Sequence, residues 1–281
     1  MKSLGKRSIV LLAFALLILY TQTNAQSTTE KEIATYALKL EELSKESDPV
    51  AKMWIHRDIG EDYKFLDVER SRKHYQSALD LADEHGSESD RFYFLERLAN
   101  IDLIAGNYLS GLRILDKHIL DVKESGDSIL VKFHYNMGLA FQQLRAYEES
   151  YSQFEQVVKL SDSLNNERMA VSVLGLIAKL YTQQENYEQA LVLKKEALER
   201  AVEAKLEPIQ GYVAKDLGNI FLQLDQLDSA EYYVKKALEI SEEQNRFFFI
   251  AGESYVILSK VLLKAKRYPE AIKAGNRAKD I

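Results

Sequence analysis

An amphipathic pattern of about 40 residues recurs along most of this 281-residue chain. Its clearest copy surrounds Gly138 and reads as two helices, about 130–144 and 147–163, joined by a tight turn at Arg145-Ala146. The residue that opens the second helix returns after 39, 40, 40 and 41 positions, at Tyr108, Tyr147, Tyr187, Leu227 and Tyr268. Self-similarity at this period predicts an all-α solenoid of about six stacked helix-turn-helix units.

Small and aromatic residues hold matching places in successive copies. In the first helices a large apolar residue precedes Gly138, Ala178 and Gly218, and an aromatic residue follows each of them three positions later. In the second helices a small residue returns at Ala190, Ala230 and Ala271. This arrangement resembles tetratricopeptide repeats, in which small residues let neighbouring helices approach closely. The resemblance covers about residues 50–281 and implies a superhelical α-solenoid.

The period of this chain exceeds the usual 34 residues of a tetratricopeptide repeat. Each unit therefore contains roughly one extra helical turn, shared between its two helices. That longer variant resembles the repeat regions of bacterial sensor histidine kinases and regulators. Such a resemblance describes a scaffold and does not name its ligand.

The N-terminus has the three parts of a secretory signal peptide. Three basic residues among the first seven precede an unbroken apolar run of twelve, Ile9 to Tyr20, and Thr23-Asn24-Ala25 supplies small residues for cleavage. The alternative is a membrane anchor, but the run is shorter than the roughly 17–25 residues that span a bilayer. We therefore predict a signal peptide over residues 1–25, export to the bacterial periplasm, and a mature tetratricopeptide domain over 26–281.

Composition restricts the partners of the mature chain. Loss of Lys2, Lys6 and Arg7 with the signal peptide changes the formal net charge from −6 to −9. An acidic surface argues against nucleic acid and against anionic membrane as partners. With no cysteine, the chain has neither disulfides nor thiol chemistry, so burial of its 46% apolar residues must stabilise it. After signal cleavage we expect no association with a membrane.

The sequence offers no set of residues that indicates catalysis. Its five histidines do not fall three to five residues apart on one helix, and no His-Glu-x-x-His occurs. The glycines fall at repeat positions or caps, and none forms a phosphate-binding loop. No Gly-x-Ser-x-Gly is present. We therefore predict a protein that is not an enzyme and has no metal site and no cofactor.

The resemblance to tetratricopeptide repeats implies a binding groove lined by the first helices of the units. Transferred copy by copy, the face of those helices that points inward carries amides, tyrosines and lysines. Amides can bond a peptide backbone, tyrosines can stack on side chains, and lysines can meet carboxylates. The candidate peptide-binding residues are Tyr135, Gln142, Gln143, Lys179, Gln183, Tyr212, Lys215, Asn219 and Gln223. We expect them to lie on the groove and outside the seams between helices.

One fragment of this set has a more specific counterpart. Lys215-Asp216-Leu217-Gly218-Asn219 has the Lys-x-x-Gly-Asn form of the carboxylate clamp, with which chaperone-binding tetratricopeptide domains hold a peptide's terminal carboxylate. The match is partial, because the next copy has Ile257 where the clamp has Asn, and the sequence stops before another copy. The fragment is either half of a clamp or a coincidence of repeat residues.

The N-terminal end of the array is expected to carry a covering half-unit. A helix over about 30–46 precedes the first repeat, whose helices are predicted over about 50–65 and 67–84. In this repeat Phe65 is expected to point inward, and Gly86 is expected to be a left-handed C-cap.

The other end lacks a capping helix. Repeat arrays usually finish with a polar helix that covers the last packing face, whereas this sequence stops at Ile281, within the second helix of unit six. We therefore expect a partner, or a segment missing from this sequence, to cover the last repeat.

These observations lead to one functional hypothesis with two competitors. We predict an exported module that binds protein or peptide in its groove and acts as the extracytoplasmic sensory input of a signalling system. The alternative is a structural scaffold in a cell-envelope assembly, and the third is an enzyme whose site the sequence does not reveal. The sequence names neither the ligand nor the oligomeric state.

Overall fold

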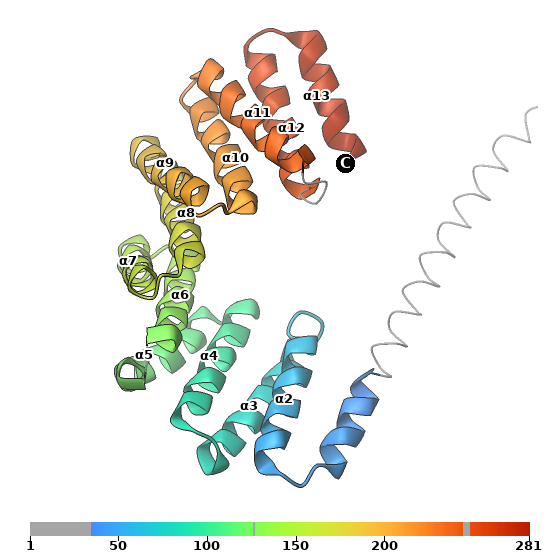
Figure 1. Cartoon of the computed structure of the whole chain (residues 1–281), viewed down its shortest axis with the longest axis vertical. Coiled ribbons are helices and arrows are strands. Elements are labelled where there is room, and N and C mark those ends of the chain that lie inside the picture. The colour runs from blue at the N-terminus through green and yellow to red at the C-terminus, as the bar shows by residue number, and fades with distance from the viewer. Residues whose placement is uncertain (1–34, 126, 244–247) are drawn as a thin grey trace, which may run out of the picture. The chain divides into compact units, whose positions relative to one another are not determined.

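The computed structural model describes residues 35–125, 127–243 and 248–281, and all regular secondary structure in those ranges is helical (Figure 1). The predicted signal peptide, residues 1–25, lies outside the described residues. The chain divides into two compact units, Met1–Ala105 and Gly106–Ile281. The all-α architecture predicted from the repeats is confirmed.

The helices alternate as first and second members of successive repeats. In the first unit, helical residues 35–45 precede α2 (Pro49–Tyr63), α3 (Val68–His85) and α4 (Glu88–Ile104). The second unit contains α5 (Tyr108–Ser125), α6 (Asp127–Gln143), α7 (Tyr147–Ser163), α8 (Glu167–Gln183), α9 (Tyr187–Glu203), α10 (Glu207–Gln223), α11 (Leu227–Glu243), α12 (Phe248–Lys264) and α13 (Tyr268–Asp280).

Side-chain caps start the helices of the first unit. Asp48 accepts a hydrogen bond from the Ala51 amide at 3.0 Å, and Pro49 occupies the first turn of α2, where its missing N–H costs nothing. Ser87 and Asp90 form a reciprocal capping box at the start of α4. These local signals fix where each helix begins and therefore which face it buries.

The small residues of the first helices lie against the eighth residue of each second helix. A Cβ added at Gly138 would lie 2.5 Å from the Phe154 ring, and one added at Gly218 would lie 2.3 Å from Val234 Cγ2. The hydroxyl of Ser150 donates to the Gly138 carbonyl at 2.8 Å and locks the same crossing. The close approach predicted at these glycines is confirmed.

Left-handed residues end most helices of the second unit. The backbone φ lies between +53° and +60° at Arg145, Asn165, Glu185, Lys205, Asp225 and Lys266. The following amide bonds back to the last helical turn, as from Ala146 N–H to the Phe141 carbonyl at 2.9 Å, which is the Schellman pattern. Because each helix and its turn together take 20 residues from α6 to α10, two of them give the 40-residue period.

Two local predictions were wrong. Gly86 is extended, with φ −90° and ψ 179°, because the chain leaves α3 directly into the capping box of α4. Phe65 is 74% exposed, since α2 ends at Tyr63 and Phe65 falls in the turn that follows.

Along the described residues, no helix combines the length and apolar character that crossing a membrane requires.

Candidate functional site

A polar pocket of about 480 Å³ opens between the first helices α8 and α10 of the second unit. Its walls come from these two helices, and the second helix between them, α9, contributes one residue, Lys194. Four of the nine predicted peptide-binding residues line it. The full lining is Lys179, Thr182, Gln183, Lys194, Lys215, Asp216, Asn219 and Ile220.

Lys194 occupies a position that other repeats use for packing. It is the eighth residue of α9, and the eighth residues of α7 and α11 are Phe154 and Val234, which are fully buried. The Lys194 residue is only 5% exposed, and its ammonium donates to Asp216 Oδ2 of α10 at 2.5 Å. A buried cation is stable only when it is paired, so Asp216 is its necessary partner. Lys194 was not among the predicted site residues, because those were all taken from first helices.

Lys215 extends this ion pair into a network. Its ammonium lies 2.5 Å from Glu253 Oε2 and 3.4 Å from Asp216 Oδ1. Burial alone would raise the pKa of Asp216, but Lys194 and Lys215 hold that pKa below its usual value. Burial alone would lower the pKa of Lys215, but Asp216 and Glu253 raise it. Lys215 and Asp216 are therefore both charged at neutral pH.

Other polar groups of the pocket remain available to a ligand. Across the described ranges, neither the Lys179 ammonium nor the Asn219 side-chain amide has a hydrogen-bond or ion-pair partner. Gln183 is exposed and accepts only a long bond, 3.4 Å, from Gln142. A cation and two amides on adjacent first helices can bind a carboxylate or a peptide group.

The remaining predicted residues are placed differently. Tyr135 packs against the apolar cluster that contains Val131 and Phe154, and burial raises the pKa of its hydroxyl. Gln142 is only 8% exposed. The expectation that these side chains lie outside the helix seams is therefore wrong for Tyr135 and Gln142. Their inward position follows from the helix register, which turns them toward neighbouring helices.

Three further candidates, Gln143, Tyr212 and Gln223, are exposed but do not line the pocket. Tyr212 lies beside it, because the Lys215 ammonium sits 5.4 Å from the centre of the Tyr212 ring. This cation–π contact belongs to the same charged network.

The clamp-like fragment is engaged within the protein. In a carboxylate clamp the lysine must be available to the ligand, whereas Lys215 is bound by Glu253 and Asp216. The second of these partners is part of the same fragment. The geometry therefore favours the reading of this fragment as repeat residues rather than half of a clamp.

In the part of the chain that the structure describes, no three His, Cys, Asp or Glu side chains come together as a metal site would require. Of the charged residues that line the pocket, Lys194, Lys215 and Asp216 form ion pairs and Lys179 does not.

Comparisons with known proteins agree with this architecture. Family models described as tetratricopeptide repeat match residues 131–163 and 168–243. Among curated protein sequences, none matches this chain.

Several solved structures share the fold at low sequence identity. BtubC from P. vanneervenii superposes with a TM-score of 0.66 at 17% identity, over 76% of this chain and 90% of its own. The apo form of the quorum sensor NprR from B. thuringiensis gives 0.64 at 16%, over 90% and 71%. A signal-transduction ATPase with a tetratricopeptide repeat sensor, from Pyrococcus horikoshii, gives 0.72 at 15%, over 86% of this chain but only 38% of its own. The family models show tetratricopeptide repeats over residues 131–163 and 168–243, and the solved structures show that the chain shares the α-solenoid fold of such repeats.

Proposed function

We propose that this chain binds a protein or peptide on the first-helix face of its second unit, with the α8–α10 pocket as the centre of the contact. The observation that carries the proposal is Lys194, a lysine in a packing position, paired with Asp216 beneath an open pocket. A buried ion pair is weak support for stability, since apolar replacements are often as stable. Its presence is better explained by a polar surface that a ligand uses.

The chemistry of the pocket suits an extended peptide. Asn219 and Gln183 offer amides that can both donate to and accept from a peptide backbone, and Lys179 offers a cation for an acidic side chain. Ion pairs hold the side chains of Lys215 and Asp216 in place, so these two residues form a fixed part of the pocket wall. Many modest contacts of this kind give specificity without one dominant anchor.

We further propose that the module is exported and serves as the sensory input of a signalling system. The N-terminal pattern of basic head, apolar run and small residues supports export. Two of the structures with this fold are described as sensors or as carrying a sensor, which supports the sensory role by analogy of fold alone. A periplasmic peptide or protein would then be the signal.

Affinity capture with a matched pair of variants tests the binding role. Lys179→Ala combined with Asn219→Ala removes the two unpaired groups of the pocket, whereas Lys159→Ala removes an exposed lysine from α7. We expect envelope proteins or peptides retained by the wild-type chain to be lost from the double variant and kept by the control. Thermal midpoints should agree among the three proteins. Equal retention by the double variant would remove the pocket from the binding surface.

A further inference from the structure

A second pocket lies between second helices, on a different set of helices from the α8–α10 pocket. It has a volume of about 450 Å³ and opens between α7 and α9, and α8 supplies its buried residues. Leu174 and Ile177 are buried, whereas Val192 at the edge is 60% exposed. The apolar and aromatic lining consists of Val158, Leu174, Ile177, Tyr181, Val192 and Leu193. The pocket therefore offers a ligand mainly an apolar surface.

The charges at the edge of this pocket do not favour a charged ligand. Among the lining residues, Asp162 pairs with Arg200 at 2.5 Å. Glu155 and Lys159 carry opposite charges four residues apart on α7. An apolar lining with a balanced edge is complementary to an uncharged, largely apolar side chain.

The next groove along the array shows which side chain fills the same place there. Between α9 and α11, the Tyr233 ring stacks on the Phe221 ring of α10, with centroids 5.4 Å apart and an interplanar angle of 9°. Tyr232 meets Tyr233 edge to face, with centroids 5.0 Å apart. A ring from the second helix of that repeat therefore covers the aromatic residue of its first helix.

The α7–α9 groove lacks the two tyrosines. Helices α8 and α10 are offset by 40 residues, and so are α9 and α11. Tyr181 therefore corresponds to Phe221, and Val192 and Leu193 correspond to the two tyrosines of α11. Because leucine and valine are smaller than tyrosine and carry no ring, the aromatic residue of α8 is not covered from its own repeat.

Tyr181 is held in place from the preceding repeat instead. Its ring stacks on Tyr151 of α7, with centroids 4.7 Å apart and an interplanar angle of 28°. The side-chain amide of Gln184 donates to the Tyr151 hydroxyl at 2.6 Å and fixes this pair. The pocket is therefore a preformed space with a fixed aromatic ring in its lining.

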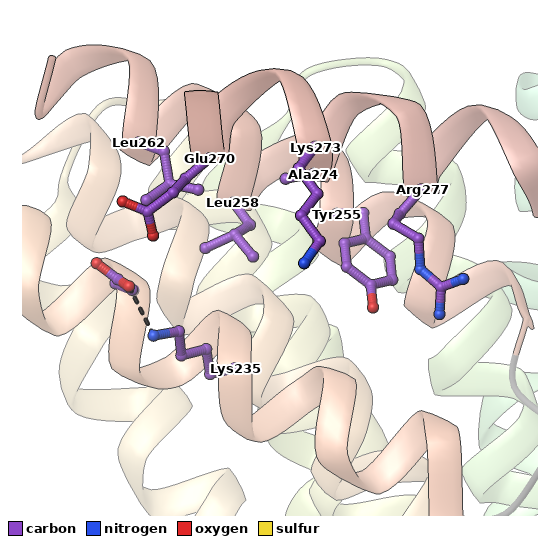
Figure 2. Close-up of a pocket in the computed structure, with 9 residues that line it drawn as sticks. Lys235, Tyr255, Leu258, Leu262, Glu270, Lys273, Ala274 and Arg277 are labelled. Carbon is purple, nitrogen blue, oxygen red and sulfur yellow. Dashed lines mark ion pairs between the residues drawn. The ribbon is translucent and has the colours of Figure 1, made fainter. Parts of the chain in front are cut away.

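A third groove agrees with this account. The pocket between α11 and α13, of about 590 Å³, has Ala274 in its lining (Figure 2). With an offset of 41 residues from α11 to α13, Ala274 stands at the position of Tyr233. Both pockets thus occur where this position carries a residue smaller than tyrosine. The α11–α13 opening is lined mostly by charged side chains (Figure 2), so the α7–α9 pocket is the more apolar of the two.

We propose that the α7–α9 pocket is a second binding site, and that it takes an aromatic side chain of a partner peptide in the place that Tyr233 occupies in the next groove. The incoming ring packs against Leu193 and the Tyr181 ring, with ring centroids about 4.5–7 Å apart, as aromatic pairs prefer. Aromatic residues suit such a place because they bury a large area at a small cost in conformational entropy. The site does not rest on the function proposed for the α8–α10 pocket, and it allows one chain to hold two partners.

Disulfide capture of small thiols tests the site directly. The natural chain has no cysteine, so Gln189→Cys at the edge of the pocket gives a single attachment point. The purified variant is equilibrated with equal amounts of 2-phenylethanethiol and 2-cyclohexylethanethiol in a thiol–disulfide buffer, and mass spectrometry measures the ratio of the two conjugates. We expect the phenyl conjugate to exceed the cyclohexyl conjugate about fivefold, which is the gain that an aromatic pair adds beyond buried area. Glu196→Cys, at an exposed position of α9 outside the lining, is the control and should give a ratio close to one.

Variants in the Gln189→Cys background locate the ring. Leu193→Tyr supplies the side chain of the next groove and should bring the ratio close to one, whereas Val202→Tyr adds a tyrosine at an exposed position of α9 outside the lining and should leave the preference intact. Lys159→Ala should also leave it intact, because an uncharged ring makes no ion pair. If Leu193→Tyr fails to fold, Val192→Tyr at the exposed edge replaces it, with the same expected loss. Equal capture of the two thiols, the same preference at Glu196→Cys, or a preference retained after the pocket is filled would overturn the proposal.

Discussion

The Lys194 ammonium of α9 donates a hydrogen bond of 2.5 Å to the Asp216 carboxylate of α10, and this bond joins two successive repeats. The two residues differ in exposure. The side chain of Lys194 is 6% exposed and that of Asp216 is 38% exposed. The lysine therefore depends on the aspartate more than the aspartate depends on the lysine, since Asp216 also contacts Lys215 and solvent.

That asymmetry predicts unequal effects of removing either partner. Asp216→Asn should lower the free energy of unfolding by about 1–3 kcal/mol, because the buried ammonium would lose its countercharge. Lys194→Met should cost less, since a flexible thioether fills a position that holds Phe154 and Val234 in other repeats. Denaturant titration of both variants and their combination measures this. A larger loss for Lys194→Met would contradict the account.

Gly218 predicts a second stability effect. A Cβ at this position would lie 2.3 Å from Val234 Cγ2 and 3.2 Å from the Ala230 carbonyl oxygen. Gly218→Val should therefore cost about 1–3 kcal/mol by overpacking the seam between α10 and α11. Gly252→Ala is the matched control, because its nearest neighbour lies 3.8 Å away. It should be neutral or slightly stabilising.

Hydrogen exchange identifies the helices that lose stability in the Gly218→Val variant. In a repeat array each unit contacts mainly its neighbours, so protection should fall in α8 to α13. Loss of protection of equal size in α2 to α4 would mean that the repeats do not behave as separable units.

The repeat pattern made most of the fold predictable. Residues such as Gly138 and Ala190 recur because packing two helices closely demands small side chains at fixed places, and that demand is visible in one sequence. The same pattern correctly predicted the helix over residues 147–163 and the turn at Arg145. The first helix of that unit begins earlier than predicted, at Asp127.

Other features lacked such a signal. The backbone is left-handed at Arg145, Glu185 and Lys205. Residues of these types rarely adopt that conformation, so their identities gave no sign of it in the sequence. The sequence could assign Tyr135 and Gln142 to one face of a helix. How far their side chains are buried depends on the neighbouring helices, which the sequence of that helix does not reveal. Lys194 could have been found from one observation, a lysine at the position of Tyr75, Phe154 and Val234 in the other second helices.

The left-handed turns predict stabilising substitutions. A non-glycine residue in this conformation costs about 1–2 kcal/mol, which glycine avoids at the price of a more flexible unfolded chain. Glu185→Gly, at φ +59°, should raise the free energy of unfolding by about 0.5–1 kcal/mol. Asn165→Gly should gain less, because asparagine tolerates this conformation. Glu188→Gly, in the first turn of α9, is the control and should destabilise.

Export predicts a defined mature N-terminus. If residues 1–25 are a signal peptide, protein recovered from the periplasm should begin at or near Gln26, as Edman sequencing or mass spectrometry would show. Leu12→Arg would break the apolar run and should leave the uncleaved chain in the cytoplasm. Recovery of the wild-type chain with Met1 and the apolar run intact would remove the export proposal and leave both binding proposals standing.

A histidine pair in the first unit predicts a dependence of stability on pH. His56 Nδ1 and His74 Nδ1 lie 2.8 Å apart, and the Tyr36 hydroxyl lies 3.3 Å from His74 Nε2. Burial, then the proximity of His56 and Arg70, lowers the pKa of His74 to about 4. The pKa of His56 is also lowered, by burial and by Lys52. Both imidazoles are therefore neutral in the folded protein at pH 7.

The sign of the effect follows from where protons bind. Between pH 6.5 and 4 the unfolded chain protonates these histidines and the folded unit resists, so the free energy of unfolding falls as the pH is lowered through that window. Because His74 is only half-buried, we expect a loss of about 1–2 kcal/mol from this residue, less than the full pKa shift implies. Thermal midpoints measured from pH 7 to 4 should decline more for the wild type than for His74→Gln. Parallel curves for the two proteins would show that the histidine pair does not control the acid sensitivity of this unit.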